Sequence, residues 1–141
     1  MSCPLCDTPG GTLLWQGDLC RVVRADEPDY PGFLRVILNT HVKEMTDLPA
    51  VDQQALLQAL LATEAALREV MQPDKVNLAS LGNVVPHLHW HVIPRFRDDP
   101  HFPNPVWGER KRDTPHPAPP DLDAQLTGAL SRQLARVRGT E

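Results

Sequence analysis

The chain has few cysteines, no long hydrophobic run and no excess of positive charge, and each shortage excludes a class of protein. No stretch approaches the ~20 consecutive apolar residues that span a bilayer, so we expect no membrane partner. Three cysteines in 141 residues are too few and too unevenly placed for a disulfide framework. A net charge of −4 argues against binding of nucleic acid, although a local site can still hold a phosphate-bearing small molecule.

The beginning of the chain and its length indicate the class of protein. Residues 1–6 lack the basic and apolar regions of a secretory signal peptide, so we expect a cytoplasmic protein whose cysteines are reduced or bound to metal. A chain of 141 residues is long enough for one domain with a hydrophobic core.

Short strand-like segments and two helical segments predict the fold. Gly17-Asp18 is a hairpin signal between the first two strands, and leucines recur at helical spacing between Pro49 and Pro73. A second amphipathic helix begins near Leu122. The expected strands are residues 13–16, 19–25, 33–38 and 76–81 and the segment that begins at residue 87. We therefore expect an α+β fold, a five-stranded antiparallel sheet with one long helix and a C-terminal helix.

Half of the six histidines lie in one short segment, Pro86–Pro94. His87, His89 and His91 alternate with apolar residues, and alternation with a period of two predicts a strand from which all three imidazoles project on one face. Such an array suits a metal ion with an open position for water. It equally suits a neutral imidazole that attacks an electrophile while its neighbours hold its tautomer and the developing charge. An ordinary half-buried strand is the remaining interpretation.

The residues of this segment resemble a known sequence signature. His-Leu-His-Trp-His-Val-Ile fits every position of the pattern His-φ-His-φ-His-φ-φ, where φ is apolar, and Ile93-Pro94-Arg95 is also typical. The chain thus resembles the histidine triad (HIT) family of nucleotide hydrolases and transferases over about residues 3–97, and is most similar to its dinucleoside polyphosphate hydrolase branch. The resemblance implies a HIT-like fold, a nucleotide substrate, no catalytic cofactor and a homodimer.

The resemblance also implies roles for individual residues. His89 is the expected nucleophile in the hydrolysis of a phosphoanhydride or phosphoramidate, through a nucleotidyl-histidine intermediate. His91 is expected to bind the transferred phosphoryl group, and His87 to support the site or bind zinc. Asp26 matches a ribose-binding position and Asn83 a phosphate-binding position. A solvated loop for Asp26 and a turn amide for Asn83 stay open as alternatives.

The resemblance adds two ligands to a pair of cysteines. Cys3-x-x-Cys6 alone is half of a zinc site. In several HIT proteins such a pair binds zinc with a histidine after the third strand and with the first histidine of the triad, here His41 and His87. We therefore expect either a structural zinc site or a surface turn with two free thiols, and we expect Cys20 in the core.

Three segments make up the predicted single domain. They are the HIT-like catalytic body (1–97), a proline-rich arm (98–120) and the C-terminal helix (121–141). Phe102 and Trp107 of the arm are expected to dock on the body or on a second subunit. The basic run at residues 110–112 is interpreted as solvated.

Two other functions stay open beside the nucleotide hydrolase. One is a metal-dependent hydrolase that uses the histidine cluster, and the other is a nucleotide-binding regulatory protein with little turnover. The motif does not choose among dinucleoside polyphosphates, nucleoside phosphoramidates and adenylated compounds.

Overall fold

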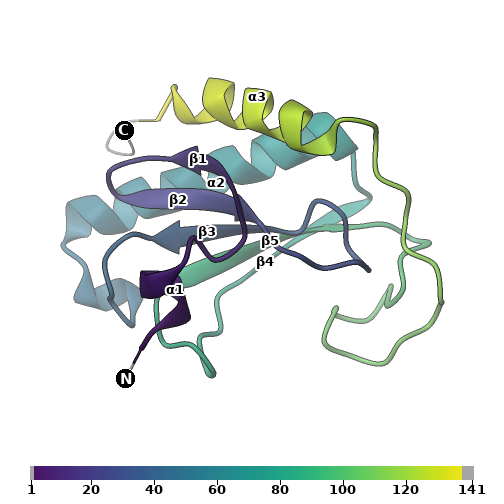
Figure 1. Ribbon diagram of the computed structural model, residues 1–141, viewed down its shortest axis with the longest axis horizontal. Helices are drawn as coiled ribbons and strands as arrows, with labels where there is room; N and C mark the ends of the chain where they lie inside the picture. The colour runs from purple at the N-terminus through teal and green to yellow at the C-terminus, as the bar shows by residue number, and fades with distance from the viewer. Residues whose placement is uncertain (1, 138–141) are drawn as a thin grey trace.

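Five antiparallel strands form one sheet in the spatial order β1-β2-β3-β5-β4 (Figure 1). The computed structural model describes residues 2–137. Its elements are α1 (Pro4–Asp7), β1 (Thr12–Gln16), β2 (Cys20–Arg24), β3 (Leu34–Leu38), the short 3-10 helix η1 (Met45–Asp47), α2 (Ala50–Met71), β4 (Lys75–Ala79), β5 (His89–Arg95) and α3 (Leu122–Leu134). The predicted α+β fold, with a long helix and a C-terminal helix, is confirmed.

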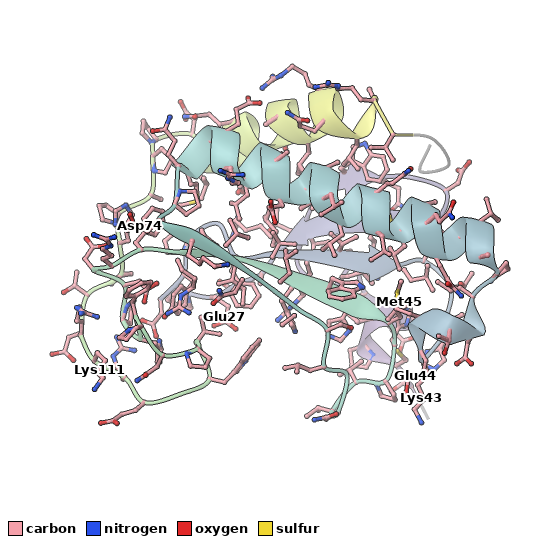
Figure 2. All side chains as sticks on the ribbon, turned by 180° about the vertical axis from the view of Figure 1, so that it is seen from behind. Glu27, Lys43, Glu44, Met45, Asp74 and Lys111 are labelled. Carbon is pink, nitrogen blue, oxygen red and sulfur yellow. The ribbon has the colours of Figure 1, made fainter. Side chains whose placement is uncertain are left out.

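Helices α2 and α3 cover one face of the sheet (Figures 1 and 2). As predicted, α2 begins after Pro49 and ends before Pro73, and its C-cap residue, Gln72, has a left-handed backbone with φ of 49°. On the covered face, Val22 lies opposite Val36 of the next strand, and both pack in the main core with the leucines of α2 and α3. Within residues 2–137, no helix is both long and apolar enough to cross a membrane.

The opposite face of the sheet carries the histidines. The register places Ile37 of β3 opposite His89 of β5 and Arg35 opposite His91, so these four side chains share one face. Short α1 packs on this face through Leu5, which contacts Ile37. Tyr30, from the loop after β2, and Val106, from the proline-rich arm, pack on another part of this face. The face lies on the side of the sheet away from α2 (Figure 2).

Two local features differ from the sequence prediction. Residues 4–7 form a helix of one turn, which the sequence did not predict; both cysteines of this N-terminal segment are free thiols. The last strand begins at His89, so His87 precedes it. The predicted start of this strand at residue 87 is therefore two residues too early. The ring of His87 is hydrogen-bonded to the carbonyl oxygen of Leu38 and lies against Cys3 of the N-terminal segment.

A buried ion pair fixes the proline-rich arm to β5. The guanidinium of Arg95 donates to both carboxylate oxygens of Asp99, at 2.8 and 3.2 Å. It also donates to the carbonyl oxygen of Asn104 at 2.7 Å and lies over the rings of Tyr30 and Phe102. The arm is thus ordered against the body through contacts with a strand residue.

The basic run at residues 110–112 is exposed, as predicted, and two of its side chains also form hydrogen bonds with the protein. Arg110 donates two hydrogen bonds to Asp29, at 2.6 and 3.2 Å, and Arg112 donates to the carbonyl oxygens of Asp99 and Phe102. These side chains bind the arm to the loop after β2 and to the arm's own backbone. Local sequence could not indicate this, because the partners are far away along the chain or are carbonyl groups.

Candidate active site and metal centre

His89 is held in one tautomer by the main chain. Its Nδ1 lies 2.5 Å from the carbonyl oxygen of His87, and the side chain is 9% exposed. A carbonyl oxygen only accepts, so Nδ1 carries the proton and Nε2 of the neutral ring keeps its lone pair. Ser80 donates to the carbonyl oxygen of His89 itself at 2.9 Å, which ties β5 to the end of β4. The arrangement leaves Nε2, and not Nδ1, available to a bound molecule.

His91 is neutral at physiological pH. Burial, together with the nearby charges of His89 and Arg35, lowers the pKa of His91 to about 4. Its Nδ1 is buried, and no group in the described part of the chain bonds to it. The ring packs edge-on against those of Phe33 and Trp107, each at a centroid distance of 5.5 Å, and against His89 at 5.0 Å.

A pocket of about 250 Å³ opens beside His89. It is lined by Pro4, Leu5, Thr8, Gly10, Arg35, Val85 and His89. Gly10 has φ of 88°, and a Cβ atom there would lie within 3 Å of the side chains of Leu5 and Ile37. Glycine is thus required where the N-terminal segment crosses the sheet close to the pocket.

Arg35 is a pocket residue that sequence reasoning missed. An arginine within a predicted strand is usually solvent-facing, and Arg35 was interpreted only as part of that strand. The register instead puts it opposite His91, with one N–H donated to the carbonyl oxygen of Gly10 at 3.2 Å. Period-two alternation relative to the apolar core residues of β3 is the signal that could have placed it on the histidine face.

Trp107 is brought to the site by the arm. The side chain is 56% exposed, yet its indole lies at the edge of the His91 ring. The arm that carries it is held by the Arg95–Asp99 ion pair and by Arg110. The expectation that Trp107 docks on the body is met within one chain.

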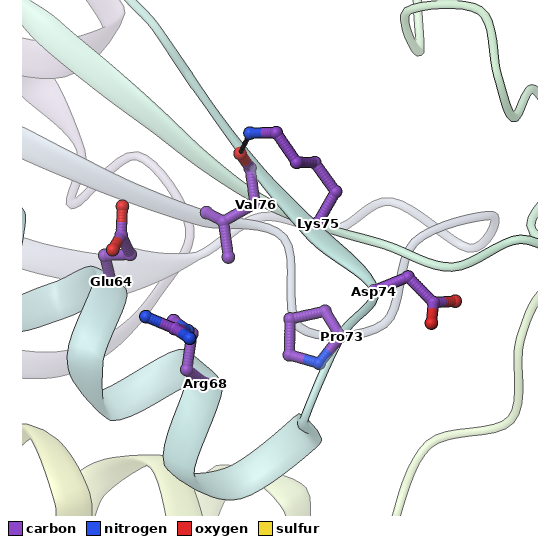
Figure 3. Close-up of a pocket in the computed structure, with 6 residues that line it drawn as sticks. All are labelled: Glu64, Arg68, Pro73, Asp74, Lys75 and Val76. Atoms are coloured by element: carbon purple, nitrogen blue, oxygen red, sulfur yellow. Dashed lines mark hydrogen bonds between the residues drawn. The ribbon is translucent and has the colours of Figure 1, made fainter.

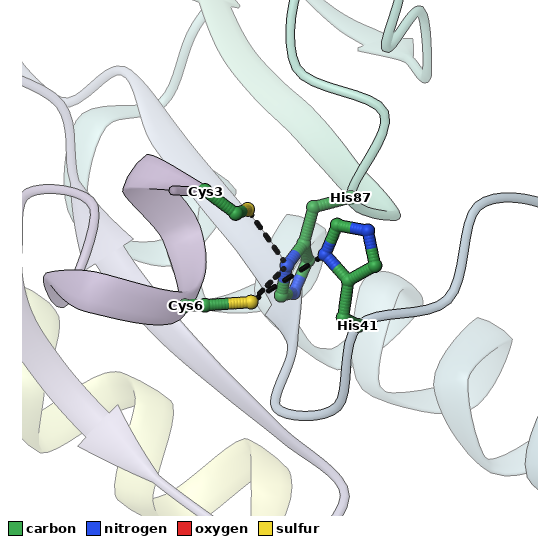
Figure 4. Close-up of side chains that lie close together, drawn as sticks. All are labelled: Cys3, Cys6, His41 and His87. Atoms are coloured by element: carbon green, nitrogen blue, oxygen red, sulfur yellow. Dashed lines mark hydrogen bonds between the residues drawn. The ribbon is translucent and has the colours of Figure 1, made fainter. Parts of the chain in front are cut away.

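Cys3, Cys6, His41 and His87 form a compact cluster at the N-terminal edge of the site (Figure 4). Nδ1 of His87 lies 3.4 Å from both sulfur atoms, and Nδ1 of His41 lies 3.4 Å from Sγ of Cys6. All four candidate ligand atoms lie within 4.8 Å of one another. The predicted convergence of these side chains is therefore observed, and the cluster could bind a metal ion.

The geometry of this cluster fits zinc. Tetrahedral bonds of ~2.3 Å to sulfur and ~2.0 Å to nitrogen require ligand atoms about 3.5 Å apart, close to the 3.4 Å found. His87 uses its second nitrogen, Nε2, on the carbonyl oxygen of Leu38 at 2.6 Å, which fixes the ring as the backbone fixes many metal-binding histidines. Burial also lowers the pKa of His87, which favours the neutral form that binds metal.

The third cysteine and the two proposed nucleotide contacts lie elsewhere. Cys20 is fully buried, as expected, and burial raises the pKa of its thiol to about 12. Asp26 is exposed in the loop after β2, and Asn83 is exposed in the loop before β5. Neither side chain forms a hydrogen bond within residues 2–137, and neither lines the pocket beside His89.

A second hollow, of about 220 Å³, lies between the C-terminal half of α2 and the start of β4 (Figure 3). Glu64, Arg68, Pro73, Asp74, Lys75 and Val76 line it. Lys75 there donates to the carbonyl oxygen of Val76 at 2.7 Å. This hollow shares no residue with the pocket beside His89, and no histidine or cysteine lines it. The candidate catalytic and metal-binding side chains therefore lie on the histidine face of the sheet.

Known proteins provide an independent comparison. The chain is similar to an AP-4-A phosphorylase of Mycobacterium tuberculosis, at 26% identity over 106 residues covering 71% of this chain and 54% of the relative. It is also similar to a bis(5'-adenosyl)-triphosphatase of Saccharomyces cerevisiae, at 30% identity over 77 residues covering 50% of this chain and 37% of the relative. The chain thus spans about half the length, or less, of these curated relatives.

Similarity to a solved structure extends over nearly the whole fold. A histidine triad protein from Marinobacter aquaeolei is 31% identical, with a TM-score of 0.71 and 92% of each chain covered. A family model described as HIT domain matches residues 10–98, which is more than half of the chain and includes all three histidines of the motif. The chain belongs to the HIT domain family.

Proposed function

We propose that the protein hydrolyses a phosphoanhydride or phosphoramidate bond of a nucleotide through a nucleotidyl-His89 intermediate. The main support is the hydrogen bond from Nδ1 of His89 to the carbonyl oxygen of His87, which leaves the lone pair of Nε2 free in a residue that lines the pocket. A neutral imidazole is a competent nucleophile near pH 7.

The reaction has two steps. In the first, Nε2 of His89 forms a bond to the α-phosphorus, and the bond from phosphorus to the leaving group breaks, so that the leaving group departs with the electron pair. In the second, water attacks the same phosphorus, the P–N bond breaks, and Nε2 regains its lone pair. Water supplies the hydroxyl group of the nucleoside monophosphate and releases its other proton.

His91 has a separate role in this proposal. An N–H group that is buried and unbonded is rare in folded proteins, so we place the proton of His91 on Nε2 and leave the buried Nδ1 unprotonated. The N–H at Nε2 then donates to an oxygen of the transferred phosphoryl group. Asp26 is also proposed as a ribose contact and Asn83 as a phosphate contact; both are exposed loop residues outside the lining of the pocket.

The proposed substrate class is dinucleoside polyphosphates. The names of the mycobacterial and yeast relatives describe enzymes of such compounds, and the chain resembles that branch after the triad as well. Because the chain matches only part of those relatives, their activities need a direct test on this protein. Phosphorolysis, in which phosphate replaces water in the second step, is separated from hydrolysis by the nature of the nucleotide product.

Zinc at Cys3, Cys6, His41 and His87 is proposed to be structural. Four protein ligands complete a tetrahedral site and leave no position for a reacting water. This argues against the metal-dependent hydrolase, which needs an open ligand position. When bound, zinc would link α1 to the loop after β3 and to the residue before β5. No catalytic cofactor is proposed.

The decisive experiment is rapid quench of wild type and of His89→Asn with diadenosine polyphosphate labelled at the α-phosphorus. We expect an acid-labile, base-stable adduct on His89 in wild type and none in the variant. Turnover of His89→Asn at the wild-type rate would overturn the mechanism. Tight nucleotide binding without adduct or turnover in wild type would instead identify a regulatory nucleotide-binding protein.

We also propose that the arm and the C-terminal helix belong to one domain with the body, and that this domain forms a homodimer. Within the domain, Arg24 of β2 pairs with Asp123 of α3 at 2.5 Å. For the dimer, β4 ends the sheet and leaves one strand edge unpaired. Exposed Leu57 and Leu61 lie on the same stripe of α2 as Arg68, beside this edge.

A further inference from the structure

Arg35 is a partly buried cation with most of its hydrogen-bonding capacity unused. Its guanidinium has five N–H donors, and one of them donates to the carbonyl oxygen of Gly10. Across residues 2–137 no carboxylate forms an ion pair with it. The exposed carboxylate of Glu27 acts on it only through space, while burial lowers the pKa of Arg35. Such a charge is expensive to keep partly out of water unless a partner arrives.

The position of Arg35 indicates what that partner is. Arg35 lies opposite His91 in the strand register, and it lines the same pocket as His89. Its positive charge reaches the imidazole of His91, whose pKa it helps to lower. The other pocket residues besides His89 are apolar or small. Among the residues that line the pocket, Arg35 is therefore the fixed cation.

We propose that Arg35 is a substrate-binding residue that contacts an anionic phosphate oxygen of the nucleotide bound at His89. This inference rests on the proposed function and deepens it, because it assigns a fixed positive charge to the nucleotide phosphate. A guanidinium presents paired N–H groups that match two oxygens of one phosphate. Its partial burial makes each such bond stronger than one formed in water.

A contact with the base is the competing assignment for the same residue. Arginine also stacks on aromatic rings and donates to base edges. The two assignments differ in one measurable respect. A phosphate contact strengthens binding only of ligands that carry phosphate, whereas a base contact strengthens the binding of adenosine as much as that of its phosphates.

The test measures binding of adenosine, AMP and ADP by calorimetry to wild type, Arg35→Gln and Arg35→Lys. We expect Arg35→Gln to lose AMP and ADP affinity by about 10- to 100-fold and to bind adenosine as wild type does. Arg35→Lys should recover part of the loss, because it keeps the charge without the paired donors. Arg68→Gln, at an exposed arginine on α2, is the control with the same charge change, and its affinities should match those of wild type.

Three outcomes would overturn the inference. They are equal AMP affinity in wild type and Arg35→Gln, an equal loss for adenosine and AMP, and a wild type that binds AMP no better than adenosine. Thermal melts of all variants establish that they are folded, and Arg35→Lys carries the comparison if Arg35→Gln is not. Binding does not require turnover, so an Arg35-dependent phosphate affinity in a protein without a His89 adduct would sink the proposed function and leave this inference standing.

Discussion

The carboxylate of Asp99 accepts two hydrogen bonds from the guanidinium of Arg95, and the two side chains are 1% and 3% exposed. The same carboxylate accepts backbone N–H groups of Phe96, His101 and Phe102, at 2.7 to 3.0 Å. One carboxylate therefore shapes the start of the arm and neutralises a cation that would otherwise be buried alone. The pair joins the last strand to the segment that carries Trp107.

Removing this carboxylate should be strongly destabilising. Asp99→Asn leaves Arg95 buried without its counter-charge, for which a loss of about 3–5 kcal/mol in the free energy of unfolding is expected. Asp98→Asn is the matched control, because Asp98 is 65% exposed and pairs only with His116 at the surface. Urea denaturation of both variants measures the difference. Equal stabilities would contradict the role assigned to Asp99.

The Asp99 interaction should also fade in acid. Burial raises the pKa of Asp99, but the hydrogen bonds from Arg95 and the backbone outweigh it and lower the pKa to about 2. The folded-state pKa thus lies below the unfolded value of ~3.9, so the stabilisation is complete above that value and is lost as the pH falls toward 2. The stability advantage of wild type over Asp99→Asn should be constant from pH 7 to 5 and shrink by about 2 kcal/mol at pH 2.5. An advantage that is unchanged at pH 2.5 would exclude this titration.

The cysteine–histidine cluster should hold one zinc ion per chain. Cys6→Ser removes one of four ligands, so the metal content measured by mass spectrometry should fall well below one, and the Tm should fall by about 10 °C. Cys20→Ala is the control, because it opens a core cavity and lowers the Tm while zinc stays bound. Zinc-free wild type with an unchanged Tm would refute a structural role for the metal.

Replacing His91 and replacing His89 should have different effects on kcat and on formation of the adduct. His91→Ala keeps the nucleophile and loses a phosphoryl donor, so kcat should fall about 10²- to 10³-fold while the adduct on His89 still forms. His89→Asn should lose more and form no adduct. His116→Gln, at a histidine of the arm that does not line the pocket, should keep kcat within about twofold. Equal losses and no adduct in both site variants would remove the separation of roles.

The proposed dimer has its own test. Leu61→Glu puts a charge on the exposed apolar stripe of α2 beside the β4 edge, so it should convert a dimer into a monomer in sedimentation experiments. Val51→Glu changes a more exposed residue in the first turn of the same helix and should leave the dimer intact. A wild-type protein that sediments as a monomer at micromolar concentration would exclude the homodimer.

Local pattern was enough to predict the sheet, the long helix and the facing of two histidines. The alternation of apolar and polar residues places His89 and His91 on the same side, and the prolines at 49 and 73 bracket α2. The cluster of His41 with the two cysteines was reached through family resemblance, because nothing local links residues more than 30 positions apart.

The remainder depends on contacts between distant segments. The pocket position of Arg35 follows from the crossing of the N-terminal segment, and its sequence neighbours are ordinary strand residues. The burial of Asp99 follows from Arg95, and an aspartate beside prolines is typical of an exposed turn. The helix at residues 4–7 is too short for its periodicity to be recognised. In each case the partner decides the environment, and the partner was not identifiable from the local sequence.

His87 contributes both to the cysteine–histidine cluster and to the hydrogen bond that orients His89. Its ring lies against the cysteines, and its carbonyl oxygen accepts a hydrogen bond from the N–H at Nδ1 of His89. We therefore expect oxidation of the thiols, or removal of a metal bound to them, to shift the proposed nucleophile His89 through this one peptide unit. On this proposal, a loss of activity on His87 substitution would reflect the position of His89 and not bond making by His87. Assays of the proposed activity should therefore control the redox state of the N-terminal thiols.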